Sequence, residues 1–343
     1  MTTSKKIALY ILTAIIAIAL AVGFFVYQTF YQPVVSVEVP KRIFIDQDDT
    51  IDSVFHKIKT TLQPTSMRGI TWASKYYDYD QHIRTGCFTI QPSFSSLQLI
   101  RKLKVGSQTP VNLVIKGVRT PGQMASNLAK QLMLDSAAIA RVFTDSLACS
   151  QLGFTTTTFP CMVIPNTYEV YWNMSSKQLF ARLKKEYTVF WNEKRRKQAE
   201  AIGLSPMEIS ILASIVEEET KEKNDMRMVA GLYLNRLRRG MLLQADPTVK
   251  FALNKLMLQR IYNKDLTIDS PYNTYLYAGL PPGPIRFPSI ISINSVLNYA
   301  QHRFLYMCAK EDFSGTHNFA VTLREHVRNA KRYWAALNRR KIK

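Results

Sequence analysis

The feature that most constrains this chain is an uninterrupted apolar run near its N-terminus. No charged residue occurs between Lys6 and Glu38. A membrane-spanning helix needs about 20 consecutive apolar residues, and residues 7–28 supply them. Basic residues ahead of a first span keep the preceding end of the chain in the cytoplasm. We therefore predict a cytoplasmic tail at 1–6, a single transmembrane helix at 7–28, and the remaining residues outside the cytoplasm.

A cleaved signal peptide is the alternative interpretation of this run. The apolar region of a signal peptide is typically about 7–15 residues long and ends in small residues. Here the run is longer, and the bulky residues Phe24, Phe25 and Tyr27 occupy the zone in which cleavage would fall. The sequence therefore favours an uncleaved anchor.

The charge balance predicts an anionic neighbour. Among 343 residues, Lys and Arg number 45 and Asp and Glu number 25, which gives a net charge of +20. Such an excess suits nucleic acid, anionic lipid or an acidic wall polymer. Export argues against nucleic acid. Small basic clusters occur at 194–197, at 236–239 and at the C-terminus, and either solvated helix faces or a field that attracts anionic polymers would explain them.

The cysteines predict no disulfide scaffold and no metal centre. Cys87, Cys149, Cys161 and Cys308 are widely separated, and the sequence contains neither a CxxC pair nor an HExxH motif. Structural zinc sites need such spacings, so we expect no metal and no cofactor. Isolated buried thiols are the favoured interpretation, and one disulfide is the alternative.

Two patterns divide the part of the chain after the apolar run, and together they predict an α+β fold. Up to about residue 117, β-branched runs alternate with amphipathic segments, which predicts a linker into a first strand at 33–48, strands at 86–90 and 111–115, and helices at 50–62 and within 93–106. From Thr120 helical periodicity dominates, at 120–134, 135–145 and 175–200, with an irregular interruption at 154–172. We predict a small module at 45–117 and a mainly α domain at 119–338.

The segment LSPMEISILASIVEEETKEK carries the most informative pattern. Ser205, Pro206 and Glu208 have the spacing of a capping box, with proline at the first helical position. On a helical wheel the large aliphatic residues fill one arc centred near Leu212. Glu219 falls about 20° from that centre. Glu218 falls at the edge of the arc, and Glu217 falls on the polar side, where we expect it to be solvated.

A carboxylate that faces an apolar core is costly to ionise, so burial should raise the pKa of Glu219. A glutamic acid with a raised pKa is what general-acid catalysis requires near neutral pH. The alternative is that the helix ends before Glu219 and that all three glutamates are solvated.

Polar and aromatic residues are concentrated in the segments after this helix, which we interpret as loops. Six of them suit sugar hydroxyls and sugar faces and form our candidate substrate-binding set: Gln244, Asp246, Tyr272, Asn273, Tyr275 and His317. Asp246 also suits a helix cap or a second catalytic carboxylate. His317 suits a proton carrier, a sugar ligand or a structural hydrogen bond. The tyrosines suit stacking platforms or ordinary packing, and the proline-rich segment GLPPGPI would form a rigid cleft wall.

Five ordered motifs, ASIVEEET, LQADPTV, SPYNTY, GLPPGPI and GTHNF, resemble those of the YceG-like (MltG) family of endolytic murein transglycosylases. The similarity is densest over 205–335. Residues 45–117 are similar to the LysM-like subdomain of that family. The segment IPNTY stands where the family often has FPDTY, so the uncharged Asn166 replaces an acid there.

The resemblance implies cleavage of the β-1,4 MurNAc–GlcNAc bond within nascent glycan strands, which leaves 1,6-anhydroMurNAc ends and helps to terminate elongation. It places the essential glutamate directly before a threonine, at Glu219, the residue that the helical wheel selects independently. One carboxylate suffices, because the MurNAc C6 hydroxyl attacks intramolecularly and replaces an activated water.

The implied setting is the bacterial inner membrane, with the catalytic domain in the periplasm or other extracytoplasmic space. The implied partners are peptidoglycan strands and peptidoglycan synthases. Two alternatives stay open: a non-catalytic peptidoglycan-binding or division scaffold, and a muramidase-type hydrolase in which Asp246 would handle water.

Overall fold

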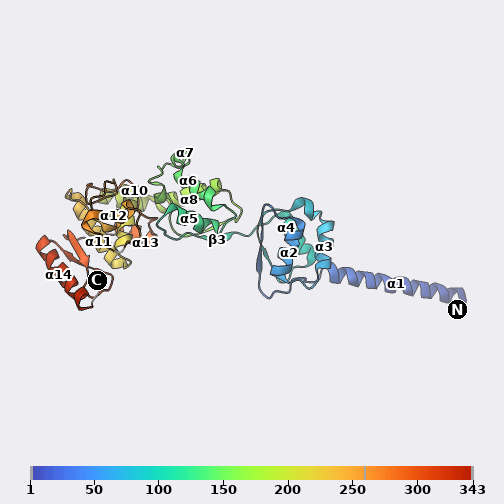
Figure 1. Cartoon of the computed structure of the whole chain (residues 1–343). Coiled ribbons are helices and arrows are strands. Elements are labelled where there is room, and N and C mark those ends of the chain that lie inside the picture. The colour runs from blue at the N-terminus through green and yellow to red at the C-terminus, as the bar shows by residue number, and fades with distance from the viewer. Residues whose placement is uncertain (1–2, 259, 341–343) are drawn as a thin grey trace. The chain divides into compact units, whose positions relative to one another are not determined.

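The computed structural model describes residues 3–258 and 260–340, and its helices and strands are labelled in Figure 1. The chain divides into two compact units. Unit 1 comprises residues 1–112 and 169–174, and unit 2 comprises 113–168 and 175–343. The result is a mixed α and β fold with an apolar N-terminal helix, as the sequence predicts.

Unit 1 begins with the apolar segment, which forms one continuous helix. Its elements are α1 (Thr3–Phe30), β1 (Lys41–Ile45), α2 (Ile51–Leu62), α3 (Met67–Tyr76), the 3₁₀ turn η1 (Tyr79–His82), β2 (Gly86–Ile90) and α4 (Ser96–Val105). Helix α1 is long and apolar enough to cross a membrane, and none of its residues is buried. Its last turns contact the rest of the unit, where the Phe25 ring lies 5.9 Å from that of Trp72 and Thr29 accepts a hydrogen bond from Ser96.

A small core holds the rest of unit 1 together. Strands β1 and β2 pair antiparallel, with Ile43 opposite Phe88. The inward side chains of this sheet pack on the apolar faces of α2, α3 and α4, so that Ile45, Ile58, Ile70 and Leu103 are fully buried. The strand predicted at 86–90 and the helix end predicted at Gly106 are confirmed, since Gly106 takes the left-handed conformation that terminates α4.

Strands β3 (Val111–Val114) and β4 (Thr167–Val170) form a second two-stranded sheet. The strand predicted at 111–115 is therefore present. Strand β4 lies within the segment 154–172, which we expected to be irregular. The sequence did not predict this strand, because a run of four residues is too short to show a period of two.

Unit 2 is mainly helical. Its elements are α5 (Pro121–Ala129), α6 (Ser136–Thr144), α7 (Ser146–Gln151), η2 (Phe159–Met162), α8 (Ser176–Phe190), α9 (Glu193–Ile202), α10 (Pro206–Glu219), α11 (Lys223–Arg238), α12 (Asp246–Ala252), η3 (Asn263–Asp265), α13 (Ile290–Leu297), β5 (Tyr306–Ala309), β6 (His317–Ala320) and α14 (Leu323–Arg339). The helix predicted at 175–200 is wrong in one respect. Trp191 ends α8 and Asn192 caps α9, so the segment forms two helices.

Helix α10 lies at the centre of unit 2, where α9, α11, α12 and α13 all contact it (Figure 1). Every residue from Ile209 to Glu217 is buried. A helix that neighbours surround in this way has no solvent side. Its polar side chains must therefore find partners inside the protein.

Two segments that we interpreted as loops are regular structure. The aspartate of LQADPTV begins helix α12, and GTHNF contributes strand β6, which pairs antiparallel with β5 so that His317 lies opposite Ala309. Helix α14 packs on this hairpin. Strands of four residues are too short for periodicity to reveal. All four cysteines are free thiols, with Cys308 on β5 and the other three buried.

Candidate active site

The carboxyl end of α10 sets the position of the candidate site. The capping box predicted at its start is present, because the Ser205 side chain and the Glu208 side chain each bond the other residue's backbone N–H. Glu219 is the last residue of the helix and Thr220 caps it. The alternative in which the helix ends before Glu219 is therefore wrong.

Glu219 lines a cavity of about 250 Å³. The lining residues are Glu219 from α10, Leu232, Tyr233 and Arg236 from α11, Leu243, Gln244, Asp246, Tyr275, Met307, Cys308, Ala309 and His317. The lining residues are spread between positions 219 and 317, so several separate elements meet around one carboxyl group. The Tyr233 hydroxyl donates a hydrogen bond of 2.6 Å to Oε1 of Glu219.

The environment of Glu219 favours its protonated form. Burial raises the pKa of this carboxyl group, and the nearby negative charge of Asp246 raises it further. The Tyr233 hydrogen bond and the charge of His317 act in the opposite direction, but the net pKa shift is upward. The direction agrees with the prediction from the sequence.

A buried aspartate orients His317. Nδ1 of His317 lies 2.7 Å from Oδ2 of Asp225, and the backbone N–H of His317 donates to Oδ1 of the same carboxylate at 3.1 Å. Burial lowers the pKa of His317, but the hydrogen bond and charge of Asp225 outweigh burial and the net shift is upward. The ring therefore carries positive charge over a wider pH range than an ordinary histidine.

Asp246 faces the same cavity with a different partner. Its Oδ1 accepts a hydrogen bond of 2.6 Å from the Tyr275 hydroxyl. Asp246 is the first residue of α12, whose cap is Ala245, and its side chain makes no capping bond. The helix-cap interpretation of Asp246 is therefore wrong, whereas Tyr275 does line the cavity as a candidate substrate contact should.

Arg236 supplies a second positive charge to the cavity, and the sequence marks it only as part of the basic cluster at 236–239. It is buried, and it donates to the backbone carbonyls of Leu305 at 2.6 Å and of Leu243 at 2.8 Å. Its Nη1 also lies 3.3 Å from Oε1 of Gln244, which positions that exposed side chain. Gln244 has a left-handed backbone with φ of 52°, a conformation that few residues other than glycine adopt.

Two predicted substrate contacts lie away from the cavity. Asn273 is fully buried, and its amide donates to the carbonyls of Leu266 and Ile268, while its oxygen accepts from the N–H of Tyr275. Its hydrogen-bonding groups therefore hold the loop and do not line the cavity. Tyr272 packs its ring 4.7 Å from that of Phe251, as the packing interpretation expected.

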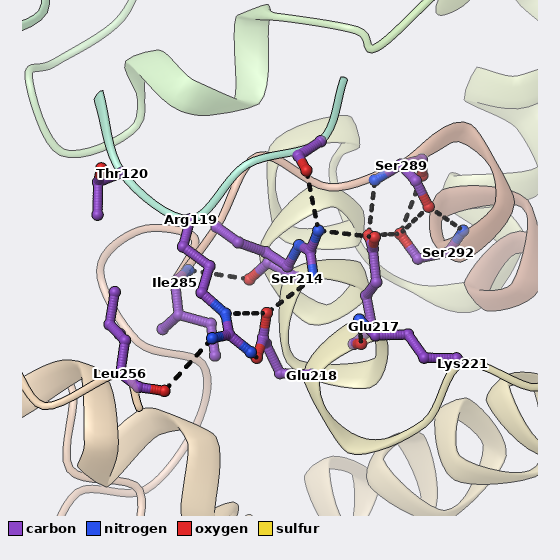
Figure 2. A network of polar contacts seen from close by, with 12 residues as sticks. Arg119, Thr120, Ser214, Glu217, Glu218, Lys221, Leu256, Ile285, Ser289 and Ser292 are labelled. Carbon is purple, nitrogen blue, oxygen red and sulfur yellow. Dashed lines mark hydrogen bonds and ion pairs between the residues drawn. The ribbon is translucent and has the colours of Figure 1, made fainter. Parts of the chain in front are cut away.

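The two glutamates directly before Glu219, Glu217 and Glu218, form a network with arginines, which Figure 2 shows. Arg119 binds Glu218 through two nitrogens, with Nε at 3.0 Å and Nη2 at 2.7 Å. Arg286 bridges the two carboxylates, at 2.7 Å from Glu218 and 3.0 Å from Glu217. Burial alone would raise the pKa of Glu218, but the hydrogen bond from Arg119 and the charge of Arg286 lower it. Glu218 is thus held as an anion.

The prediction that Glu217 is solvated is wrong. Glu217 is 7% exposed, and its Oε2 accepts from the Ser289 N–H at 2.7 Å and from the Ser292 hydroxyl at 3.0 Å (Figure 2). The polar stripe of α10 faces the start of α13 rather than water. Ser214 on the same stripe accepts from the N–H of Ile285 at 3.0 Å.

The sequence profile of the YceG-like family matches residues 43–332. This chain belongs to the YceG-like family. A 2.6 Å crystal structure of a YceG-like protein from Listeria monocytogenes superposes with a TM-score of 0.58 at 26% identity, over 85% of this chain and 99% of that one.

Two curated relatives carry the name endolytic murein transglycosylase. The protein of Bacillus subtilis strain 168 is 42% identical over 127 residues, which are 37% of this chain and 34% of the relative. That of Streptococcus pneumoniae strain R6 is 25% identical over 352 aligned positions, which cover 92% of this chain and 63% of the relative. This YceG-like chain therefore spans less than two thirds of the length of either relative in these matches.

Three residues of this YceG-like site were not predicted from the sequence: Tyr233, Arg236 and Asp225. All three lie on α11, and the charged run at 236–239 suggested only a basic cluster. Helical periodicity would predict α11, but not that its face meets Glu219 and His317. In the part of the chain that the structure describes, no group of three or more metal-ligating side chains occurs.

Proposed function

We propose that this chain is a membrane-anchored endolytic murein transglycosylase. It would cleave the β-1,4 MurNAc–GlcNAc bond within nascent glycan strands and leave 1,6-anhydroMurNAc ends. The observation that carries the proposal is a single carboxylic acid of raised pKa, Glu219, in a polar cavity at the end of a buried helix. The names of the Bacillus and Streptococcus relatives support the same activity.

In the first step Glu219 acts as the general acid. Because burial raises its pKa, Glu219 keeps its proton nearer to neutral pH than an exposed glutamic acid does. It gives this proton to the glycosidic oxygen as the bond to C1 of MurNAc breaks. Positive charge then develops on the sugar ring, as in other glycoside cleavages.

In the second step Glu219 acts as the base. The hydrogen bond from Tyr233 and the positive charge of His317 both favour the carboxylate that remains after proton transfer. This carboxylate takes the proton of the MurNAc C6 hydroxyl, whose oxygen closes on C1. Attack from within the same sugar has a high effective concentration, so no second catalytic carboxylate is required.

The remaining polar groups of the cavity would bind the sugar. Gln244, Asp246, Tyr275 and His317 all line it and supply donors and acceptors for hydroxyl groups. Arg236 adds a charge that its carbonyl partners hold in place. Tyr272 and Asn273 would act indirectly, by holding the loop that carries Tyr275.

The apolar helix α1 would anchor the protein in the inner membrane with its N-terminus in the cytoplasm. The catalytic domain, at about 119–338, would then lie outside the cytoplasm where new glycan emerges, so that cleavage would help to terminate elongation. We assign the module at about 45–117 a LysM-like role in glycan binding. The compact core that strands β1 and β2 form with α2, α3 and α4, and that includes residues before position 45, supports this assignment.

The variant Glu219→Gln tests the proposal. Glutamine keeps the size and hydrogen bonding of glutamate but cannot donate and recover a proton. General acid–base catalysis contributes typically about 10²–10⁴-fold, so release of anhydromuropeptides from sacculi should fall at least by that factor. Glu200→Gln, an exposed substitution on α9, is the matched control.

Mass spectrometry of the released fragments separates the proposal from its alternatives. Anhydro ends that depend on Glu219 support a lytic transglycosylase. Reducing ends would instead indicate a hydrolase in which Asp246 activates water. If sacculi treated with wild-type protein gave the same fragments as untreated sacculi, the chain would be a scaffold without catalytic activity.

A further inference from the structure

A second and larger cavity lies in unit 2, separate from the residues around Glu219. Its volume is about 760 Å³, which falls within the range of small-ligand sites. Three helices and the residues that cap two of them line this cavity. The lining residues are Asn192, Lys194, Arg195 and Gln198 at α9, Lys223 and Arg227 on α11, and Ile291, Asn294, Ser295 and Asn298 at α13. The last four residues follow the i, i+3, i+4, i+7 spacing of one helix face.

The charge of this cavity is of one sign. Four of its ten lining residues are lysine or arginine, and none is acidic. The nearest acids in the sequence have partners elsewhere. Glu193 pairs with Lys197 at 2.7 Å, and Glu222 caps α11 by accepting from the Asp225 N–H at 2.7 Å. The cavity therefore suits an anionic ligand.

Its arginines are held in place while retaining free donors. Nη1 of Arg195 donates to the carbonyl of Phe190 at 2.9 Å, and Nε of Arg227 donates to the carbonyl of Asn298 at 2.7 Å. A guanidinium has five N–H donors, so each arginine retains donors for a ligand. Within the described residues, no hydrogen bond or ion pair engages the side chains of Lys194 and Lys223.

The uncharged lining favours a peptide over a simple phosphate. The Asn294 side chain, which no described residue engages, offers both a donor and an acceptor, and Gln198 retains its carbonyl oxygen as an acceptor. A peptide backbone presents both N–H and C=O groups, whereas a phosphate presents acceptors almost alone. Ile291 is 54% exposed beside these groups and would contact the alkyl part of a residue.

We propose that this cavity binds the acidic stem peptide of peptidoglycan, with the lysines and arginines pairing with its carboxylates. The inference rests on the proposed function, since it names the peptide-bearing form of the same substrate. Arg227 lies six residues before Tyr233 on α11, about 9 Å along the helix axis and on a different face. An extended tetrapeptide spans about 13 Å, which exceeds the axial part of this separation.

Calorimetric titration of the full chain in detergent tests the inference. The probe is the free tetrapeptide L-Ala–γ-D-Glu–meso-diaminopimelate–D-Ala, with inorganic phosphate as the comparison ligand. Wild-type protein should bind the peptide saturably and more tightly than phosphate. The double variant Lys194→Glu/Lys223→Glu should weaken peptide binding at least tenfold, because like charges then face the carboxylates.

Lys177→Glu/Lys331→Glu is the matched control, since it changes the net charge equally at two exposed lysines outside the cavity. It should stay within twofold of wild type, and thermal melts check that both variants fold. Equal weakening by both pairs, absence of peptide binding, or tighter binding of phosphate would each overturn the inference. The free peptide has no glycosidic bond, so this result is independent of whether Glu219 catalyses cleavage.

Discussion

The hydroxyl of Tyr233 donates a 2.6 Å hydrogen bond to Oε1 of Glu219. The two residues lie on successive helices, α10 and α11, which pack together. Tyr233 is itself buried, and both burial and the adjacent carboxylate raise the pKa of its phenol well above the usual value. The phenol therefore stays protonated and remains a donor near neutral pH.

Removing this donor should move the pH profile upward. The Tyr233 hydrogen bond lowers the pKa of Glu219, so Tyr233→Phe should raise that pKa further. A general acid loses activity as pH rises through its pKa. The alkaline limb of kcat/KM should therefore shift to higher pH in the variant, and the rate at the optimum should fall because the carboxylate loses a stabilising bond. The control is Tyr299→Phe, which removes a hydroxyl that accepts an exposed hydrogen bond from Arg238. This variant should leave the pH profile unchanged.

Glu217 should matter for stability. Glu217→Ala leaves the N–H of Ser289 without its acceptor and removes one of the two acceptors of the Ser292 hydroxyl. It also leaves Arg286 with one carboxylate instead of two. Removing one partner of a buried ion pair costs about 3–5 kcal/mol. Arg286 still pairs with Glu218 in this variant. We therefore expect the free energy of unfolding, measured with urea on the full chain, to fall by the lower end of that range.

The matched control for this prediction is Glu193→Ala. Glu193 and Lys197 form an exposed pair on α9, and exposed pairs contribute at most about 1 kcal/mol. Equal losses of unfolding free energy from the two variants would contradict the structural role of Glu217.

Asp225 should act through His317. Asp225→Asn removes the charge that raises the pKa of His317, and burial then lowers it. The imidazole titration, followed by NMR, should shift to lower pH, and activity near neutral pH should fall by about tenfold or more as the ring loses charge and orientation. Asp269→Asn, at an exposed aspartate bonded to Tyr277, should leave both readouts unchanged. A normal activity with a shifted titration would show that the charge of His317 is dispensable.

Two helical glycines should respond oppositely to alanine. A methyl group at Gly231 would meet the backbone carbonyl of Ala300 and, at 2.8 Å, the Nε2 atom of His302. Such overpacking costs typically about 1–3 kcal/mol, which exceeds the helix-propensity gain of about 1 kcal/mol. At Gly122 no atom lies within 4 Å of the added methyl group, so that alanine should stabilise α5. Thermal melts should show a lower Tm for Gly231→Ala and an unchanged or higher Tm for Gly122→Ala.

Local sequence signals fixed many element boundaries in advance. Capping residues and a C-terminal glycine placed the start of α10 and the end of α4, since these contacts involve neighbours within a few residues. The apolar run likewise predicted α1, because its residues are consecutive in the sequence. The short strands β4, β5 and β6 were missed, because four residues are too few to show a period of two. The split between α8 and α9 was missed although Asn192 supplies a local cap.

The candidate site also has features that the local sequence determines and features that only tertiary contacts determine. The sequence determined that Glu219 lies on the apolar face of a helix, because its neighbours on the wheel are residues three to seven positions earlier. Its raised pKa depends on burial, which the surrounding elements supply. Only the tertiary structure decided what surrounds that helix. Tyr233, His317 and Asp246 reach Glu219 from separate elements, and α13 covers the stripe on which Glu217 was expected to meet water. Helical periodicity distinguishes the faces of one helix, but the number of faces that other elements bury depends on contacts between residues far apart in the chain.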